Sequence, residues 1–146
     1  MTIIAVKDGI MAVDSMVTVG ELKCGTTQKW MLVDDFFGGG FVAGCGDLSD
    51  VNNAMTQFLS GDKPDKLPDG SVLVWMDPAG KVKIYCGESW VEVDAHFYAE
   101  GSGMNVAIGA MAAGASAEEA AEIACEYVTT CGGEVHVLDA EAWGVK

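Results

Sequence analysis

Thr2 and Asp14 are the residues whose chemical types and spacing first suggest a reaction site. They lie on the two arms of a predicted β-hairpin, because Asp8-Gly9 between two apolar runs is typical of a type I′ turn. A two-residue turn places Ile3 opposite Asp14, so Thr2 is diagonal to the carboxylate and close to it. The same register predicts three further cross-strand pairs: Thr2 with Ser15, Ala5 with Ala12, and Lys7 with Ile10.

Thr2 directly follows Met1, and this position gives it a second functional group. If Met1 is removed, Thr2 carries both a hydroxyl and a free α-amine, and the reference pKa of such an amine is roughly 7.7 to 8.0. The amine can then accept the proton of the hydroxyl on the same residue. The pattern therefore predicts an N-terminal nucleophile with a carboxylate beside it.

Further short motifs follow the hairpin in a definite order. They are Ala12-Val13-Asp14-Ser15, Thr18-Val19-Gly20, Lys29-Trp30, Phe41-Val42-Ala43-Gly44, Gly101-Ser102-Gly103 and Cys131-Gly132-Gly133. The ordered set resembles the proteasome β-subunit and HslV group of N-terminal-threonine peptidases over essentially the whole chain. A second alignment would put Met1 at the nucleophile position. We favour Thr2. With this alignment each arm of the hairpin is two residues shorter than in typical relatives, and a shortening by an even number keeps every side chain on its face of the strand.

The resemblance implies roles for particular residues. Thr2 is expected to be the nucleophile, with Lys29 beside its hydroxyl and Asp14 orienting the lysine. Ser102 matches a serine that supports the threonine amine. Gly44 matches the glycine whose backbone N–H forms the oxyanion hole. Read alone, these residues would be an exposed strand lysine, a solvated carboxylate, a loop serine and a turn glycine.

Two positions depart from the family pattern. Cys131 stands where relatives carry serine, so a thiol that forms weaker hydrogen bonds takes the supporting place of a hydroxyl. Val128 stands where proteasome subunits usually carry an aspartate that supports the threonine. Both departures bear on how well the amine is activated.

Three functions follow from these residues. The first is a threonine peptidase that acts on unfolded polypeptide inside a homo-oligomeric ring, with an AAA+ unfoldase ATPase as a possible partner. The second is a catalytically inactive structural protein that forms such rings and retains Met1. The third, with the least support, is a cysteine hydrolase that uses Cys131, His136 and Asp139.

The composition excludes several other classes. The chain has 146 residues and a net charge of −14, and its eight basic residues are all lysine, so nucleic-acid binding is not expected. Five cysteines without a C-x-x-C pair suggest reduced thiols, and two scattered histidines give no reason to expect a metal or another cofactor. No secretory leader or membrane span is recognised, which predicts a cytoplasmic protein.

The expected fold class is α+β, and the resemblance implies one Ntn-hydrolase domain over residues 1–146, a four-layer αββα sandwich of two antiparallel sheets flanked by helices. Apolar spacing predicts a helix after a cap at Ser49 or Asp50, and a capping box at Ser116 predicts another. A Gly38-x-Gly40-x-x-Ala43 match to a dinucleotide fingerprint is set aside, because it falls in a strand. The other expected elements are an extended segment over 16–27, strands over 29–33, 39–44, 71–76, 81–85, 90–93, 96–99 and 134–138, and a small-residue helix over 104–114.

Overall fold

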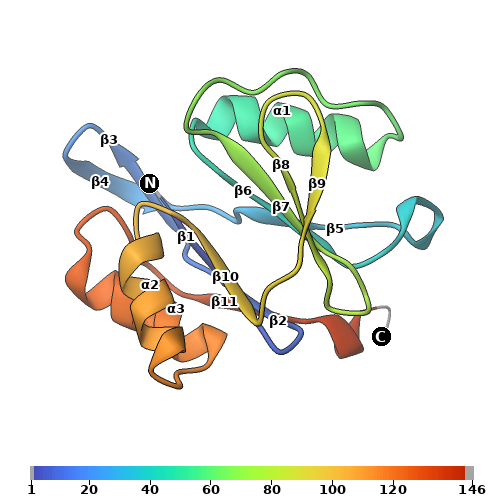
Figure 1. Ribbon diagram of the computed structural model, residues 1–146. Helices are drawn as coiled ribbons and strands as arrows, with labels where there is room; N and C mark the ends of the chain where they lie inside the picture. The colour runs from blue at the N-terminus through green and yellow to red at the C-terminus, as the bar shows by residue number, and fades with distance from the viewer. Residues whose placement is uncertain (1, 144–146) are drawn as a thin grey trace.

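A computed structural model describes residues 2–143 of the chain (Figure 1). Its strands are β1 (Ile3–Lys7), β2 (Ile10–Val13), β3 (Met16–Val19), β4 (Leu22–Thr26), β5 (Trp30–Leu32), β6 (Phe41–Cys45), β7 (Val72–Met76), β8 (Val82–Tyr85), β9 (Trp90–Val93), β10 (Phe97–Gly101) and β11 (His136–Asp139). Its α-helices are α1 (Leu48–Leu59), α2 (Met104–Ala112) and α3 (Ala117–Tyr127), and short 3-10 helices cover Asp35–Phe37 and Ala140–Ala142.

The first sheet is built around the N-terminal hairpin. Its strand order is β10-β1-β2-β11, and every neighbouring pair is antiparallel. The predicted hairpin register is confirmed, with Ala5 opposite Ala12 and Lys7 opposite Ile10. The turn is also as expected, because Asp8 and Gly9 both have positive φ, 54° and 76°.

The turn predicts a measurable glycine effect. Gly9→Ala is expected to lower the free energy of unfolding by about 1 kcal/mol, because alanine is strained at positive φ. The added methyl would meet only an ordinary contact, 3.8 Å from the Cβ of Ala140, so strain is the main cause. The control is Gly109→Ala inside α2, where the new Cβ meets nothing within 4 Å. That change should stabilise the protein by about 0.5–1 kcal/mol in urea denaturation. Equal effects at the two sites would contradict the assignment of the turn.

The second sheet has the strand order β5-β6-β7-β8-β9 and is also antiparallel throughout. It packs against the first sheet through apolar side chains on the facing surfaces. Ile4, Met11 and Val13 of the first sheet share one buried cluster with Ala43 and Val74 of the second. This inter-sheet cluster is the central core of the molecule.

The helices cover the outer face of each sheet (Figure 1). Ile3 and Ala5 of β1 pack against α2 and α3, whose small buried residues, such as Ala107 and Ala120, allow close approach. Val42 of β6 packs against α1 on the other side. The predicted α+β class is therefore confirmed, with its layers in the order helices, sheet, sheet, helix. Within residues 2–143, none of the helices has the length and apolar character needed to cross a membrane.

Several element boundaries differ from the prediction. Helix α1 begins at Leu48, and its cap is Asp47, not Ser49 or Asp50, because the Asp47 carboxylate accepts a hydrogen bond from the N–H of Asp50 at 3.1 Å. The segment predicted as extended over 16–27 is a separate hairpin of β3 and β4. The capping box at Ser116 is present as predicted.

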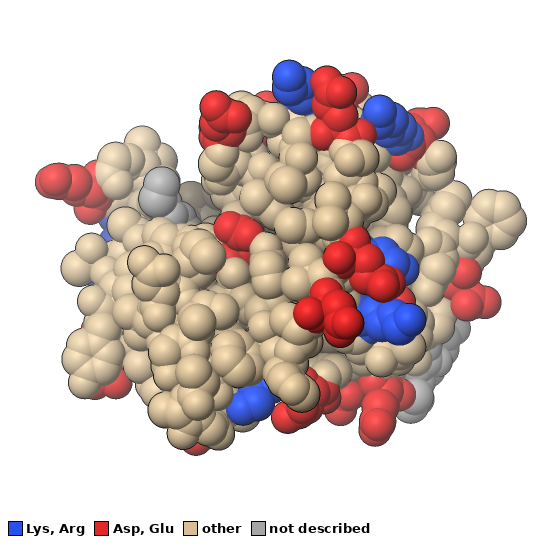
Figure 2. All heavy atoms as spheres, viewed as in Figure 1, with Lys and Arg blue, Asp and Glu red and all other residues tan. Residues whose placement is uncertain are grey.

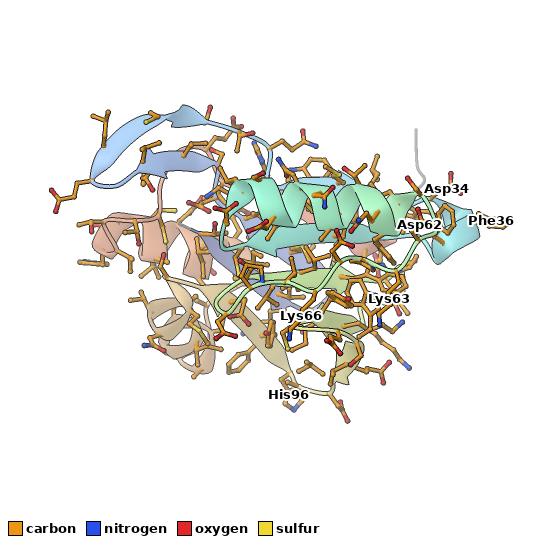
Figure 3. The ribbon with its side chains drawn as sticks, turned by 90° about the horizontal axis from the view of Figure 1, so that it is seen from above. Asp34, Phe36, Asp62, Lys63, Lys66 and His96 are labelled. Atoms are coloured by element: carbon orange, nitrogen blue, oxygen red, sulfur yellow. The ribbon has the colours of Figure 1, made fainter. Side chains whose placement is uncertain are left out.

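The charged residues are predominantly acidic, 22 Asp and Glu against 8 Lys, and Figure 2 shows Asp and Glu scattered over one face with fewer lysines among them. A few large apolar side chains are also exposed. Val19 and Leu22 project from the β3–β4 hairpin, and Phe36 is 87% exposed and points away from the body of the protein (Figure 3).

Candidate active site

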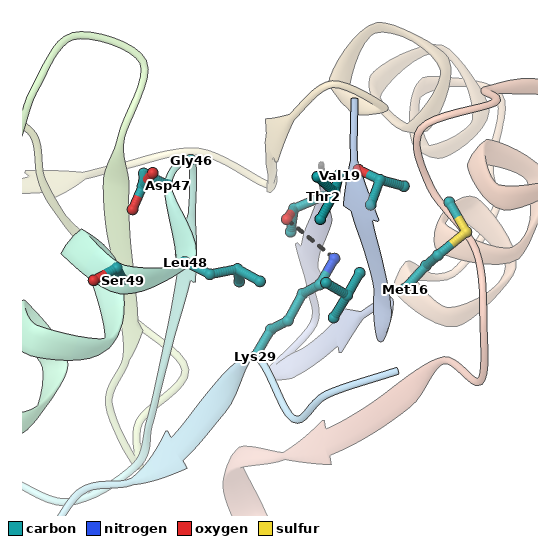
Figure 4. A pocket seen from close by; sticks show the side chains of 10 residues that line it. Thr2, Met16, Val19, Lys29, Gly46, Asp47, Leu48 and Ser49 are labelled. Carbon is teal, nitrogen blue, oxygen red and sulfur yellow. Dashed lines mark hydrogen bonds between the residues drawn. The ribbon is translucent and has the colours of Figure 1, made fainter. Parts of the chain in front are cut away.

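The predicted nucleophile, lysine and aspartate lie together at one end of the first sheet. The Lys29 Nζ donates to the Thr2 Oγ1 at 3.2 Å and to the Asp14 Oδ1 at 3.0 Å. All three side chains are buried, and Lys29 is 2% exposed, so it is not the surface lysine that its position alone would suggest. Figure 4 shows the Lys29 ammonium pointing at Thr2.

Asp14 is held by the backbone as well as by Lys29. Its Oδ1 also accepts from the N–H of Ile3 at 3.1 Å, and its Oδ2 accepts from the N–H of Gly132 at 3.0 Å. The N–H of Asp14 donates to the carbonyl of Ile3, which continues the hairpin ladder beyond Val13. The hairpin register therefore fixes the carboxylate, and its charge compensates the buried ammonium.

Lys29 is positioned by the second sheet. It directly precedes β5, and its carbonyl accepts from the N–H of Gly44 on β6 at 3.1 Å. The side chain can then cross from the edge of the second sheet to Thr2 on the first. The site therefore depends on the packing of two sheets that meet only in the folded protein.

Ser102 lies beside the main chain of Thr2, and Cys131 lies beside Ser102. The Ser102 Oγ donates to the Thr2 carbonyl at 3.3 Å and lies 3.5 Å from the Cys131 Sγ. The Thr130 Oγ1 donates to the Ser102 Oγ at 2.8 Å. Of the two predicted supporting residues, Ser102 therefore contacts Thr2 directly and Cys131 contacts Ser102, and Thr130 joins the same network.

The assignment of Gly44 as the oxyanion donor was wrong for this arrangement. Its N–H is committed to the Lys29 carbonyl inside the sheet, and Gly44 is buried under α1. A Cβ there would lie 2.7 Å from the Cβ of Val51, so close helix packing explains the glycine. Gly46, two residues further on, is exposed where β6 turns into α1. It has φ of +117°, and a Cβ at this position would lie 2.6 Å from the Cα of Ser71.

Two cavities adjoin Thr2, and Gly46 also lines both. The larger, of about 350 Å³, is drawn in Figure 4. Its wall holds several apolar side chains, among them Val19 and Leu48, together with one cation, Lys29, and one carboxylate, Asp47. The smaller, of about 250 Å³, is lined by Thr2, Cys45, Gly46, Gly70, Glu100, Gly101 and Ser102. We call them the apolar cavity and the acidic cavity. A substrate bound across Thr2 would reach into both.

The residues of the predicted cysteine hydrolase are engaged elsewhere. The His136 Nδ1 accepts a hydrogen bond from the indole of Trp30 at 3.1 Å, and the Asp139 carboxylate accepts from the N–H of Glu141 at 2.9 Å. Burial raises the pKa of the Cys131 thiol, which disfavours the thiolate that such a mechanism needs. The third hypothesis is therefore not supported by the geometry.

Thiol reactivity should follow the same pattern. Burial raises the pKa of Cys45 to about 12 and also raises that of Cys131. Cys24 and Cys86, by contrast, are exposed. With iodoacetamide at pH 8, peptide mapping should find alkylation of the exposed pair well before Cys131. Preferential alkylation of Cys131 would mean that it is an activated thiol.

The expectations about Val128, Met1 and a metal can also be compared with the structure. Val128 ends α3 and packs into the apolar cluster under the first sheet, so no carboxylate reaches Thr2 from that position. Met1, on which processing depends, lies outside the described residues. In the described part of the chain, His, Cys, Asp and Glu side chains form no group of three or more that could hold a metal ion.

Comparison with solved structures shows what the fold resembles. The chain is similar to Thiobacillus denitrificans BPH in complex with epoxomicin, with a TM-score of 0.70 and 22% sequence identity over 94% of this chain and 96% of that one. A second structure of Thiobacillus denitrificans BPH gives a TM-score of 0.69 at the same identity and coverage. At this identity the likeness concerns the fold alone. No protein-family model matches the sequence, and no curated protein sequence does either.

Proposed function

We propose that this protein is a threonine peptidase of the proteasome and HslV type, with Thr2 as its N-terminal nucleophile after removal of Met1. The observation that carries the proposal is the buried chain from the Thr2 Oγ1 through the Lys29 Nζ to the Asp14 carboxylate, with both links at hydrogen-bond distance. A buried lysine beside the hydroxyl of a threonine that lines two cavities has a catalytic use: its charge stabilises the alkoxide.

The reaction follows from these positions. The Thr2 Oγ attacks the carbonyl carbon of the scissile peptide bond, and its proton passes to the α-amine of the same residue. The N–H of Gly46, at the N-terminus of α1, is the proposed donor to the oxyanion, where the helix dipole also favours negative charge. The protonated amine then gives its proton to the leaving nitrogen, which leaves an ester on Thr2. Water hydrolyses the ester and restores the free hydroxyl.

The fold supports this proposal as an Ntn-hydrolase αββα sandwich. The sheets and helices are layered in the order that this class requires, with the nucleophile at the start of a strand in the first sheet. The structural neighbour from Thiobacillus denitrificans was solved in complex with epoxomicin. We propose that this chain reacts with electrophiles directed at an N-terminal threonine.

Assembly into a homo-oligomeric ring is part of the proposal. Enclosure would keep a nucleophile with open cavities away from folded proteins, and an AAA+ ATPase would then deliver unfolded polypeptide. Val19, which lines the larger cavity, and Leu22, its partner across the β3–β4 hairpin, are exposed apolar side chains that an interface between copies would cover. Light scattering after gel filtration should give the mass of a multimer.

The direct test is hydrolysis of unfolded casein and short fluorogenic peptides by purified protein, with mass spectrometry recording the N-terminal residue of the same sample. Cleavage by chains that begin at Thr2 supports the proposal. Chains that begin at Thr2 and cleave nothing would overturn it.

A second candidate is an inactive structural protein that retains Met1 and uses only the surfaces of the fold. Val128, in place of a carboxylate, is the observation that favours it, because the amine then lacks one anionic support. A retained Met1 on every chain, together with ring assembly, would support this candidate over the peptidase.

A further inference from the structure

The acidic cavity has one charged group among the residues that line it, the carboxylate of Glu100. Gly46, Gly70 and Gly101 contribute no side chains to the same wall. Burial raises the pKa of Cys45 to about 12, so its thiol stays neutral there. Few side chains therefore project into the cavity, and one of them carries a negative charge.

Glu100 is aimed into this space by the pairing of β10 with β1. It lies opposite Ile4, and Tyr98 lies opposite Val6 on the same face of β10, between the two sheets. The Tyr98 hydroxyl donates to the Glu100 Oε2. Burial raises the pKa of Tyr98, as does Glu100 itself, so the hydroxyl remains a donor. One carboxylate oxygen of Glu100 is thus held by a neighbour on the same strand, β10, which pairs with β1.

The acidic cavity lies on the main-chain side of Thr2. Its residue Ser102 donates to the Thr2 carbonyl, whereas Lys29, which lines the apolar cavity, approaches the Thr2 hydroxyl. In the proposed reaction the α-amine protonates the leaving nitrogen, so the leaving segment departs along the main-chain side. The acyl segment stays on the hydroxyl and faces the apolar cavity.

We propose that the acidic cavity is the subsite for the first residue of the leaving segment, P1′, and that Glu100 selects a lysine or arginine there. This inference rests on the proposed peptidase function. A long cationic side chain fills a cavity of about 250 Å³ with few side-chain walls and pairs with a partly buried carboxylate. An acidic P1′ side chain would meet a like charge with no cation to compensate it.

The test uses peptides that differ only at P1′, with lysine, glutamine or glutamate there and leucine at P1. We expect kcat/KM to be about 10-fold higher for lysine than for glutamate. Glu100→Gln should remove most of this preference, and it keeps an oxygen that can accept from Tyr98. The matched control is Glu92→Gln on exposed β9, which makes the same change in net charge and should leave the ratio unaltered.

The outcomes separate the two proposals. Cleavage of all three peptides at equal rates, or a preference that survives in Glu100→Gln, would overturn the P1′ assignment and leave the peptidase intact. Cleavage of none would overturn the peptidase and this inference with it. Should Glu100→Gln fail to fold, the glutamine peptide serves as the second measurement on the unaltered protein. A preference created by a carboxylate must place the kcat/KM of the glutamine peptide between those of the lysine and glutamate peptides, and cleavage of the glutamine peptide as fast as the lysine peptide would contradict it.

Discussion

Thr2→Ala is expected to lower peptide hydrolysis by about a thousandfold or more, because it removes the only atom that forms the proposed acyl ester. The change should cost little stability. The Thr2 hydroxyl accepts one 3.2 Å hydrogen bond from Lys29, and the lysine keeps its bond to Asp14, so the loss is about 1 kcal/mol. Initial rates and urea denaturation measured on the same preparations would check both statements.

Thr2→Ser is the matched variant, because it keeps a hydroxyl and an α-amine on one residue. It should retain a measurable fraction of the activity. If Thr2→Ala cleaved peptides as fast as the unaltered protein, another residue would be the nucleophile. Equal loss of activity in both variants would point instead to a structural role for the threonine.

Lys29→Met is the second variant for which we expect a large effect. It should lower the free energy of unfolding as well as the rate of hydrolysis. The Asp14 carboxylate is fully buried, and its ion pair with Lys29 is 3.0 Å long. Removing the ammonium leaves a buried charge with backbone donors only, which costs about 3–5 kcal/mol. Hydrolysis should fall as well, because the Thr2 alkoxide loses the nearby positive charge.

The control for this change is Lys66→Met. Lys66 and Glu88 form an exposed pair at 3.9 Å, so the loss should be within about 1 kcal/mol. Denaturation of both variants by urea gives the comparison. Similar losses at the two positions would contradict the account of Lys29 as a buried, paired group.

The hairpin shows what local sequence can predict. Asp8-Gly9 fixes both the turn type and the register, and the register determines that Asp14 lies beside Thr2, so this half of the site followed from the chain alone. The capping box of α3 and the apolar face of α1 could likewise be predicted from the sequence, because each depends on residues three or four positions apart.

The remainder depended on contacts between distant segments. Nothing local distinguishes a buried Lys29 from an exposed one, since its burial comes from the packing of two sheets. Gly44 and Gly46 are two residues apart, and only the pairing of Gly44 with Lys29 shows that Gly46 is the one that faces the cavities. The hydrogen bonds of Thr130 with Ser102 and of the Gly132 N–H with Asp14 were not predicted, for the same reason. The glycine pair after Cys131 was the one local signal that the backbone approaches another segment closely there.

Thr2 is expected to become a reactive N-terminal nucleophile. Intact-protein mass spectrometry before and after exposure to an epoxyketone tests this role most directly. We expect a chain that has lost one methionine and gains a single adduct, which is absent from Thr2→Ala. A chain that begins at Thr2 and gains no adduct, or one that is modified equally in Thr2→Ala, would contradict it.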